Sequence, residues 1–177
     1  QDNEISWLNW NQIKSNEDLL EFVKAVIAFR KAHPVFHGKR EPRMMDYEAC
    51  GFPDVSYHGV KAWAPEFDPF RRQLGILYCG SYGKRPDGTA DDYFLVVYNM
   101  HWEPHGFALP HLPKGMGWHV AFDTGDRAHN GYFEPGKEPK AENQKQLMAP
   151  ARTIIVMIGK KDGKEDVPAV VPEPAEE

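Results

Sequence analysis

The sequence predicts a mainly β protein, an antiparallel β-sandwich preceded by one amphipathic helix. Three observations support this prediction. One helical apolar pattern lies near the start of the chain, and short apolar or alternating segments follow from about residue 55. Turn-forming residues separate those segments, and the rest of the chain supplies no second long helical pattern. Short strands with turn signals between them are typical of β-sandwiches.

The helix is predicted within residues 15–34, which read SNEDLLEFVKAVIAFRKAHP. Ser15 and Asp18 have the spacing of a capping box, and Pro34 ends the helix. Apolar residues recur at helical spacing and form one stripe, made of Leu19, Phe22, Val23, Val26 and Ile27. Since no other long helix is available to cover this stripe, we expect the helix to belong to a larger body. Without that body, the stripe should cause self-association or pack on the sandwich.

The strands are predicted at 74–81, 93–100, 107–110, 118–124, 146–150 and 152–159. In the fourth of these, simple alternation places Trp118, Val120 and Phe122 on one face. The polar stretch 125–144 reads as an exposed loop. The chain ends in a charged segment that carries prolines and lacks periodicity, so we predict a disordered tail over 161–177.

Composition narrows the range of partners. A net charge of −5 argues against nucleic acid or an anionic membrane surface as a partner. No apolar run approaches the roughly 20 residues that cross a bilayer. The two cysteines, Cys50 and Cys79, lack metal-type spacing, and two free thiols are favoured over a disulfide, which points to a cytoplasmic protein.

One segment could hold a metal ion. In an extended strand, His101, Glu103 and His105 would point to one face as a ligand trio. Pro104 interrupts the strand pattern, however, and favours a turn at the rim of the sandwich with solvated side chains. We therefore predict neither a metal site nor a cofactor.

Tryptophans and carboxylates are the other candidates for chemistry. Exposed aromatic faces stack on sugar rings, and Trp63, Trp102 and Trp118 could do so. Core or interdomain packing is the favoured interpretation for all three, most strongly for Trp118. Glycoside hydrolysis needs two carboxyl groups across the scissile bond. Nothing marks Asp2 and Glu4 as such a pair, and Asp91 and Asp92 flank a turn, where we expect them to be solvated.

The opening QDNEISWLNW (1–10) lacks an initiator Met, and the helix after it ends in FRKAHPVF (29–36). Together they resemble the end of the catalytic barrel in isoamylase- or pullulanase-like glycogen debranching enzymes of the α-amylase superfamily, glycoside hydrolase family 13. The segments 55–81, 94–110, WHVAFDT (118–124) and PARTIIVMI (150–158) are similar, in the same order, to that family's C-terminal sandwich strands. Tyr57 and the segment 65–68 depart from the family pattern.

This resemblance implies a division of the chain into 1–36, the end of a barrel with its last helix, 37–160, a C-terminal β-sandwich of the α-amylase type, and the tail. It implies a parent enzyme that hydrolyses α-1,6-glucosidic branch links in glycogen, starch or pullulan. The family's catalytic carboxylates would precede Gln1, so this chain alone is expected to be inactive. The upstream barrel would pack on the apolar stripe.

The resemblance also places Asp2, Asn3 and Glu4 at the sugar-binding end of the barrel. They would either edge the substrate cleft or lock their loop by hydrogen bonds. Two other functions remain open. The chain could be an independent glucan-binding module with Trp63 and Trp102 as its platform, or a plain structural domain. An amphipathic helix preceded by this opening segment favours the enzyme fragment, since a free module has no use for either.

Overall fold

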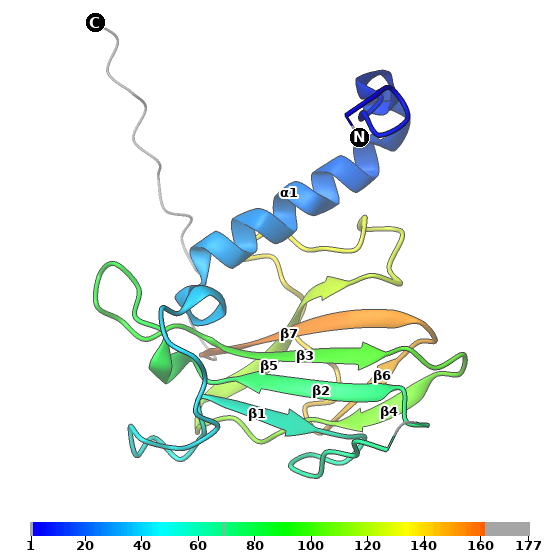
Figure 1. The fold of residues 1–177 in the computed structure, drawn as a ribbon. Coiled ribbons are helices and arrows are strands. Elements are labelled where there is room, and N and C mark those ends of the chain that lie inside the picture. The colour runs from blue at the N-terminus through cyan, green and yellow to red at the C-terminus, as the bar shows by residue number, and fades with distance from the viewer. Residues whose placement is uncertain (1, 69, 162–177) are drawn as a thin grey trace, which may run out of the picture.

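The structure is a computed structural model that describes residues 2–68 and 70–161 (Figure 1). One α-helix, α1 (Glu17–Ala32), leans across one face of a β-structure, and its N-terminal end projects beyond the strands. Short 3₁₀ turns flank it: η1 (Trp10–Gln12) and η2 (Lys14–Asn16) before it and η3 (Pro34–His37) after it. The predicted combination of a helix followed by antiparallel strands is confirmed.

Within the described residues, seven strands form two antiparallel sheets. The larger sheet has the order β1-β2-β3-β7-β5, and the smaller pairs β4 with β6. Each predicted strand is present. The bounds are β1 (Val55–His58), β2 (Gln73–Tyr78), β3 (Tyr93–Asn99), β4 (His105–Ala108), β5 (Met116–Asp123), β6 (Gln146–Ala149) and β7 (Thr153–Lys161), with η4 (Gly80–Tyr82) between β2 and β3.

The main core lies between the two sheets. Leu77, Leu95 and Met157 on the inner face of the large sheet are buried with Phe107 and Ala149 of the small one. Trp118 belongs to this core and is 1% exposed, and its indole Nε1 donates to the carbonyl of Pro110 at 2.9 Å. The interpretation of Trp118 as a core residue is confirmed.

A β-bulge in β5 overturns the prediction that Trp118, Val120 and Phe122 share one face. Trp118 pairs with Gly159 and Val120 with Met157, but the register shifts before Phe122, which pairs with Val156. One extra residue in a strand exchanges the two faces for every later side chain. Phe122 therefore turns away from the main core and onto the outer face of the large sheet.

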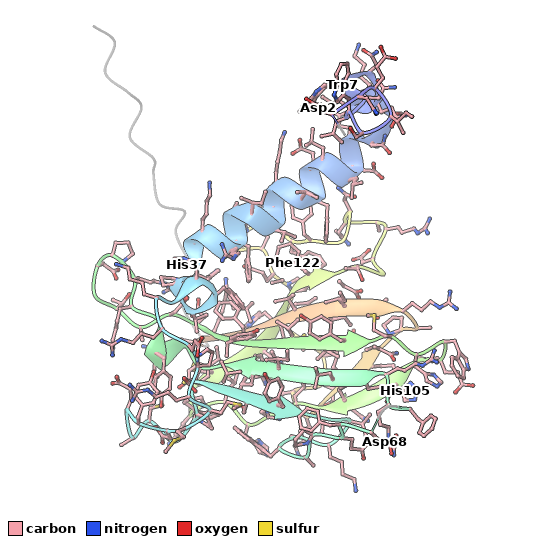
Figure 2. The ribbon with its side chains drawn as sticks, viewed as in Figure 1. Asp2, Trp7, His37, Asp68, His105 and Phe122 are labelled. Carbon is pink, nitrogen blue, oxygen red and sulfur yellow. The ribbon has the colours of Figure 1, made fainter. Side chains whose placement is uncertain are left out.

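The outer face is where α1 docks. Phe94, Ala121, Phe122 and Ile158 form a second apolar cluster, against which Phe22, Ala25 and Phe29 of α1 and Val35 and Phe36 of η3 pack. The Phe29 ring lies edge-on to Phe122 at 5.0 Å and to Phe94 at 5.4 Å between centroids. Figure 2 shows Phe122 between the helix and the sheet. The helix thus packs on the sandwich through Phe22, Ala25 and Phe29. Of the predicted stripe only Phe22 takes part, so the expectation that the stripe itself packs on the sandwich holds for that residue alone.

The start of α1 differs from the predicted capping box. Ser15 Oγ donates to the carbonyl of Gln12 at 2.9 Å, and the N-cap residue is Asn16, whose side chain makes no capping bond. The two 3₁₀ turns before Glu17 use the Ser15 hydroxyl within their own turn, so it is not available to cap. The end of the helix agrees with the prediction, because α1 stops at Ala32, two residues before Pro34.

The polar stretch 125–144 is more closely attached than an exposed loop. Phe133 donates its backbone N–H to Ala121 O at 3.0 Å, and Asn130 Nδ2 donates to Asp18 O at 2.7 Å. The stretch therefore follows the edge of β5 and reaches α1. The predicted tail begins at residue 161, which is the last residue of β7, and 162–177 lie outside the described residues. Within the described part, no helix is long and apolar enough to cross a bilayer.

The packing of α1 gives a first prediction. Phe29→Ala should lower the free energy of unfolding by about 2–3 kcal/mol, because it removes a ring from the cluster between helix and sheet. Ile27→Ala is the matched control, since Ile27 is 49% exposed, and it should cost less than about 1 kcal/mol. Urea unfolding followed by tryptophan fluorescence measures both. Equal losses would contradict the observed choice of helix face.

Candidate functional site

A second side of α1 carries an apolar surface that stays exposed among the described residues. Leu19, Val23, Val26 and Ile27 are between 40% and 58% exposed and form what we call the outer stripe. Phe22 was predicted in the same stripe but belongs to the sandwich side, 6.1 Å from the Phe122 ring. The helix therefore has two apolar sides, and within residues 2–68 and 70–161 one of them packs on the sandwich while the other is exposed.

The segment before α1 extends this surface. Ile5, Trp7, Leu8 and Trp10 are each at least 60% exposed. Figure 2 shows Asp2 and Trp7 of this segment at the N-terminal end of the helix, far from the sandwich. A contiguous exposed apolar patch on a folded protein commonly marks an interaction surface. Together, the outer stripe and this segment expose eight large apolar side chains.

Asp2 and Asn3 hold the shape of this opening segment. Asn3 Oδ1 accepts from the backbone N–H of Ile5 at 3.1 Å, and the Asn3 carbonyl accepts from Ser6 Oγ at 3.0 Å. Asp2 Oδ1 accepts from Trp7 Nε1. These bonds are of the kind expected if the segment locks its own loop. Glu4 is exposed beside them.

The two candidate sugar-stacking tryptophans lie at the surface but already have neighbours. Trp63 is 47% exposed and packs on Phe52 and on the buried ring of His58, at 5.9 and 4.7 Å. Trp102 is 58% exposed, yet His101 stacks on its ring at 4.0 Å and Arg72 lies over the ring at 5.1 Å. Their ring faces are therefore partly occupied by side chains of this chain.

The segment His101–His105 forms a turn at the rim, as predicted. The backbone N–H of Glu103 donates to His101 Nδ1 at 3.1 Å, and His105 Nδ1 bonds to the Glu103 carbonyl at 3.0 Å. These ring nitrogens are engaged with the backbone. The three side chains therefore do not form a group of potential metal ligands. Among the described residues, such a group occurs at another place.

That group consists of His33, Asp91 and Asp92, at the end of α1. A cation already lies between the two carboxylates, since Arg85 Nη2 is 3.1 Å from Asp91 and 2.6 Å from Asp92. His33 Nδ1 bonds to Asp91 Oδ1 at 2.8 Å. The arrangement is that of an ion-pair network rather than of a vacant metal site, and sequence reasoning missed it.

Asp91 was expected to be solvated, and the structure shows that its carboxylate is fully buried. It accepts from His33, from Arg85 and from the backbone N–H of Val35 at 3.2 Å. Gly80 allows this close packing, because a Cβ there would lie 2.0 Å from the Asp91 carbonyl. The carboxylate thus connects the end of α1 and the start of η3 to the turn before β3. We call this connection, made of Asp91, His33, Val35 and Arg85, the Asp91 joint.

The pKa of Asp91 follows from this environment. Burial alone would raise it, but the hydrogen bond and charge of His33 and the backbone N–H groups outweigh burial and lower the pKa below its usual value. Asp91 therefore stays ionised and keeps the joint intact.

His58 is the second buried ionisable group of note. Its Nδ1 accepts from the backbone N–H of Trp63 at 2.8 Å, and its Nε2 bonds to Ser56 Oγ at 3.0 Å. Burial lowers the pKa of His58 to about 4, so the ring is neutral at pH 7. The hydrogen bond from the Trp63 N–H to this neutral ring holds the short loop in place. Trp63 has a φ of 63°, in the left-handed region.

A groove of about 500 Å³ lies near the start of β2 and the end of β3. Sequence reasoning did not find it. Its walls combine apolar and charged side chains, namely Glu66, Phe67, Asp68, Arg71, Arg72, Gln73, Leu74, Tyr98 and Met100. An ion pair between Arg71 and Glu66, at 2.8 Å, engages two of these charges.

Comparison with known proteins identifies relatives of this chain. No protein-family model matches the chain. Over 138 residues the chain is 30% identical to proteins named "Glycogen operon protein GlgX homolog" from Mycobacterium bovis and Mycobacterium tuberculosis. The chain is a distant relative of these GlgX homologs. The alignment covers 71% of this chain but 19% of each relative, so the chain spans about a fifth of their length.

The Asp91 joint gives a second prediction. Asp91→Asn should lower the free energy of unfolding by about 3 kcal/mol, because it removes the charge that pairs with His33 and Arg85 inside the protein. Asp87→Asn, in the exposed turn of the same loop, is the control and should cost less than about 1 kcal/mol. Urea unfolding at pH 7 measures both, and an Asp91 variant as stable as the control would refute the role of the joint.

His58 gives a third prediction, on pH. In the unfolded chain the ring titrates near 6.5, and in the folded protein near 4, so between these values the unfolded state binds more protons. Stability should therefore fall as the pH drops from 6.5 to 4, by up to about 3 kcal/mol from this residue. His58→Gln should lose that part of the pH dependence, and His37→Gln, at the exposed end of η3, should keep it. Parallel pH profiles for all three proteins would disprove the assignment.

Proposed function

We propose that this chain is the C-terminal accessory domain of a glycogen- or starch-debranching glycoside hydrolase. In this proposal residues 1–36 end the catalytic barrel and residues 37–160 form the sandwich that braces it. The parent enzyme would act in the cytoplasm and hydrolyse α-1,6-glucosidic branch links in glycogen, starch or pullulan. The catalytic carboxylates would lie upstream, so the chain alone would have no activity.

The observation that carries this proposal is the division of α1 into two apolar sides. Phe22, Ala25 and Phe29 pack on the sandwich, while the outer stripe faces away from it. Exposed apolar area costs about 25 cal/mol for each Å² that could be buried. A helix with both sides apolar is suited to a position between two layers, and the sandwich supplies only one of them. An upstream barrel would supply the second.

The relationship to the GlgX homologs supports the same proposal. Their name places them in a glycogen operon, and most of their length has no counterpart in this chain. The exposed tryptophans before α1 are consistent with a segment that packs against further protein. At the sugar-binding end of such a barrel, Asp2, Asn3 and Glu4 would edge the substrate cleft, with their hydrogen bonds setting the shape of the loop.

A pair of helix variants gives a fourth prediction. Val23→Asp, on the outer stripe, should leave the 177-residue chain folded, because Val23 is 43% exposed there. In the full-length parent, encoded by the reading frame that includes this chain, the same change should lower the unfolding free energy by about 2 kcal/mol or more. Ala28→Asp, on the exposed polar side of α1, is the matched control and should be neutral in both contexts.

The measurement is thermal unfolding of both variants in both proteins, together with release of linear chains from branched glucan. A parent that lacks a barrel upstream of Gln1, or that tolerates Val23→Asp as well as Ala28→Asp, would overturn the proposal.

The alternative function, an independent glucan-binding module, rests on the exposure of Trp63 and Trp102. It predicts that the 177-residue chain is retarded in a native gel containing glycogen and that Trp63→Ala or Trp102→Ala abolishes the retardation. The accessory-domain proposal requires no such retardation. The same gel therefore separates the two functions, provided that an unrelated acidic protein of similar size serves as the reference.

A further inference from the structure

Cys50 and Cys79 are both free thiols, as the sequence predicts, and their sulfur atoms are in contact. The two Sγ atoms lie 3.8 Å apart although the residues are 29 positions apart in the chain. Cys79 follows β2 and is fully buried in the main core. Cys50 is partly exposed, in the irregular segment 38–54 that connects η3 to β1.

The segment around Cys50 is arranged to direct its thiol inward. The Asp46 carboxylate accepts from the backbone N–H groups of Cys50 and Gly51, at 3.0 and 2.8 Å. The Tyr82 hydroxyl donates to the same carboxylate at 2.9 Å and lies 3.0 Å from the Phe52 carbonyl. The Asp46 turn is thereby anchored beside η4, the 3₁₀ turn that follows Cys79 directly. This anchoring places the Cys50 thiol against the core.

We propose that Cys50 and Cys79 form a reversible intramolecular disulfide, with a low-molecular-weight disulfide such as oxidised glutathione as the oxidant. A disulfide requires the sulfur atoms to approach to about 2.0 Å. The approach from 3.8 Å can come from the Cys50 side, which belongs to no helix or strand, while β2 holds Cys79 in place. The bond would tie the connection between α1 and β1 to the large sheet.

The exchange would proceed in two balanced steps. The Cys50 thiolate attacks oxidised glutathione, whose S–S bond breaks, and one glutathione thiolate leaves as a mixed disulfide forms. The Cys79 thiolate then attacks Cys50 Sγ and releases the second glutathione. The two protons lost by the protein thiols are taken up by the two glutathione thiolates. The protein is oxidised by two electrons, and the glutathione disulfide is reduced by two.

Accessibility sets the order of these steps. Cys50 can meet a small disulfide, because it is partly exposed, whereas Cys79 is not reached by solvent. Burial also raises the pKa of Cys79 to about 11, so little thiolate is present at pH 7. The second step should therefore be the slow one, and it should accelerate as the pH rises. Cys50 should carry a transient glutathione.

The test is incubation of the 177-residue protein in glutathione buffers of increasing oxidised fraction, followed by alkylation and intact-mass measurement. We expect unalkylated protein that has lost two hydrogen atoms and a tryptic peptide that links Cys50 to Cys79. The melting temperature of this species should rise by about 5–10 °C over the reduced protein, because the bond closes a loop of about 30 residues.

Two variants serve as controls. Cys50→Ser should remain reduced at Cys79 in every buffer, and Cys79→Ala should stop at one glutathione on Cys50. The melting temperature of neither variant should rise on oxidation. Alkylation of both wild-type thiols in all buffers, or a wild-type product that stops at the mixed disulfide, would overturn the proposal. If the disulfide forms without raising the melting temperature, the proposal that it stabilises the connection between α1 and β1 is wrong.

Discussion

The buried carboxylate of Asp91 is the interaction on which the arrangement of this molecule depends. It binds the His33 ring and the Val35 backbone N–H, which lie just after α1, and the Arg85 guanidinium, which lies in the loop before β3. An isolated buried charge would cost several kcal/mol, and only this full set of partners makes it tolerable. Because His33 directly follows α1, the position of Asp91 fixes where the helix ends and how it leaves the sheet.

The bulge in β5 is the second feature that fixes the position of α1 on the sheet. Without the extra residue, Phe122 would face the main core, and the outer sheet face would lack the ring that contacts Phe22 and Phe29. Because of the bulge, the same side of α1 makes aromatic contacts along its length and polar contacts at its C-terminal end. The orientation of α1 about its own axis is set by both, so the outer stripe must face away from the sandwich.

Periodicity was enough to predict the helix and the six strand segments, because burial of one face repeats at a fixed spacing. It could not predict the bulge, since the alternation of Trp118, Val120 and Phe122 continues unbroken in the sequence and the shift appears only in the pairing of β5 with β7. Nor could it predict the burial of Asp91, whose partner His33 is 58 positions away and whose neighbours in sequence are typical of a turn. The groove near Arg72 and the contact of Cys50 with Cys79 arise from tertiary packing alone.

The surface of the protein bears on the choice between a brace and a free binding module. Trp102 has His101 and Arg72 over its ring, and Trp63 rests on His58 and Phe52, so a sugar would compete with existing contacts at both. Among the described residues the outer stripe stays 40–58% exposed, because α1 contributes its other side to the sandwich. Burying this exposed apolar area would gain free energy. This contrast favours the proposed accessory domain, with a second protein layer on α1, over the free binding module.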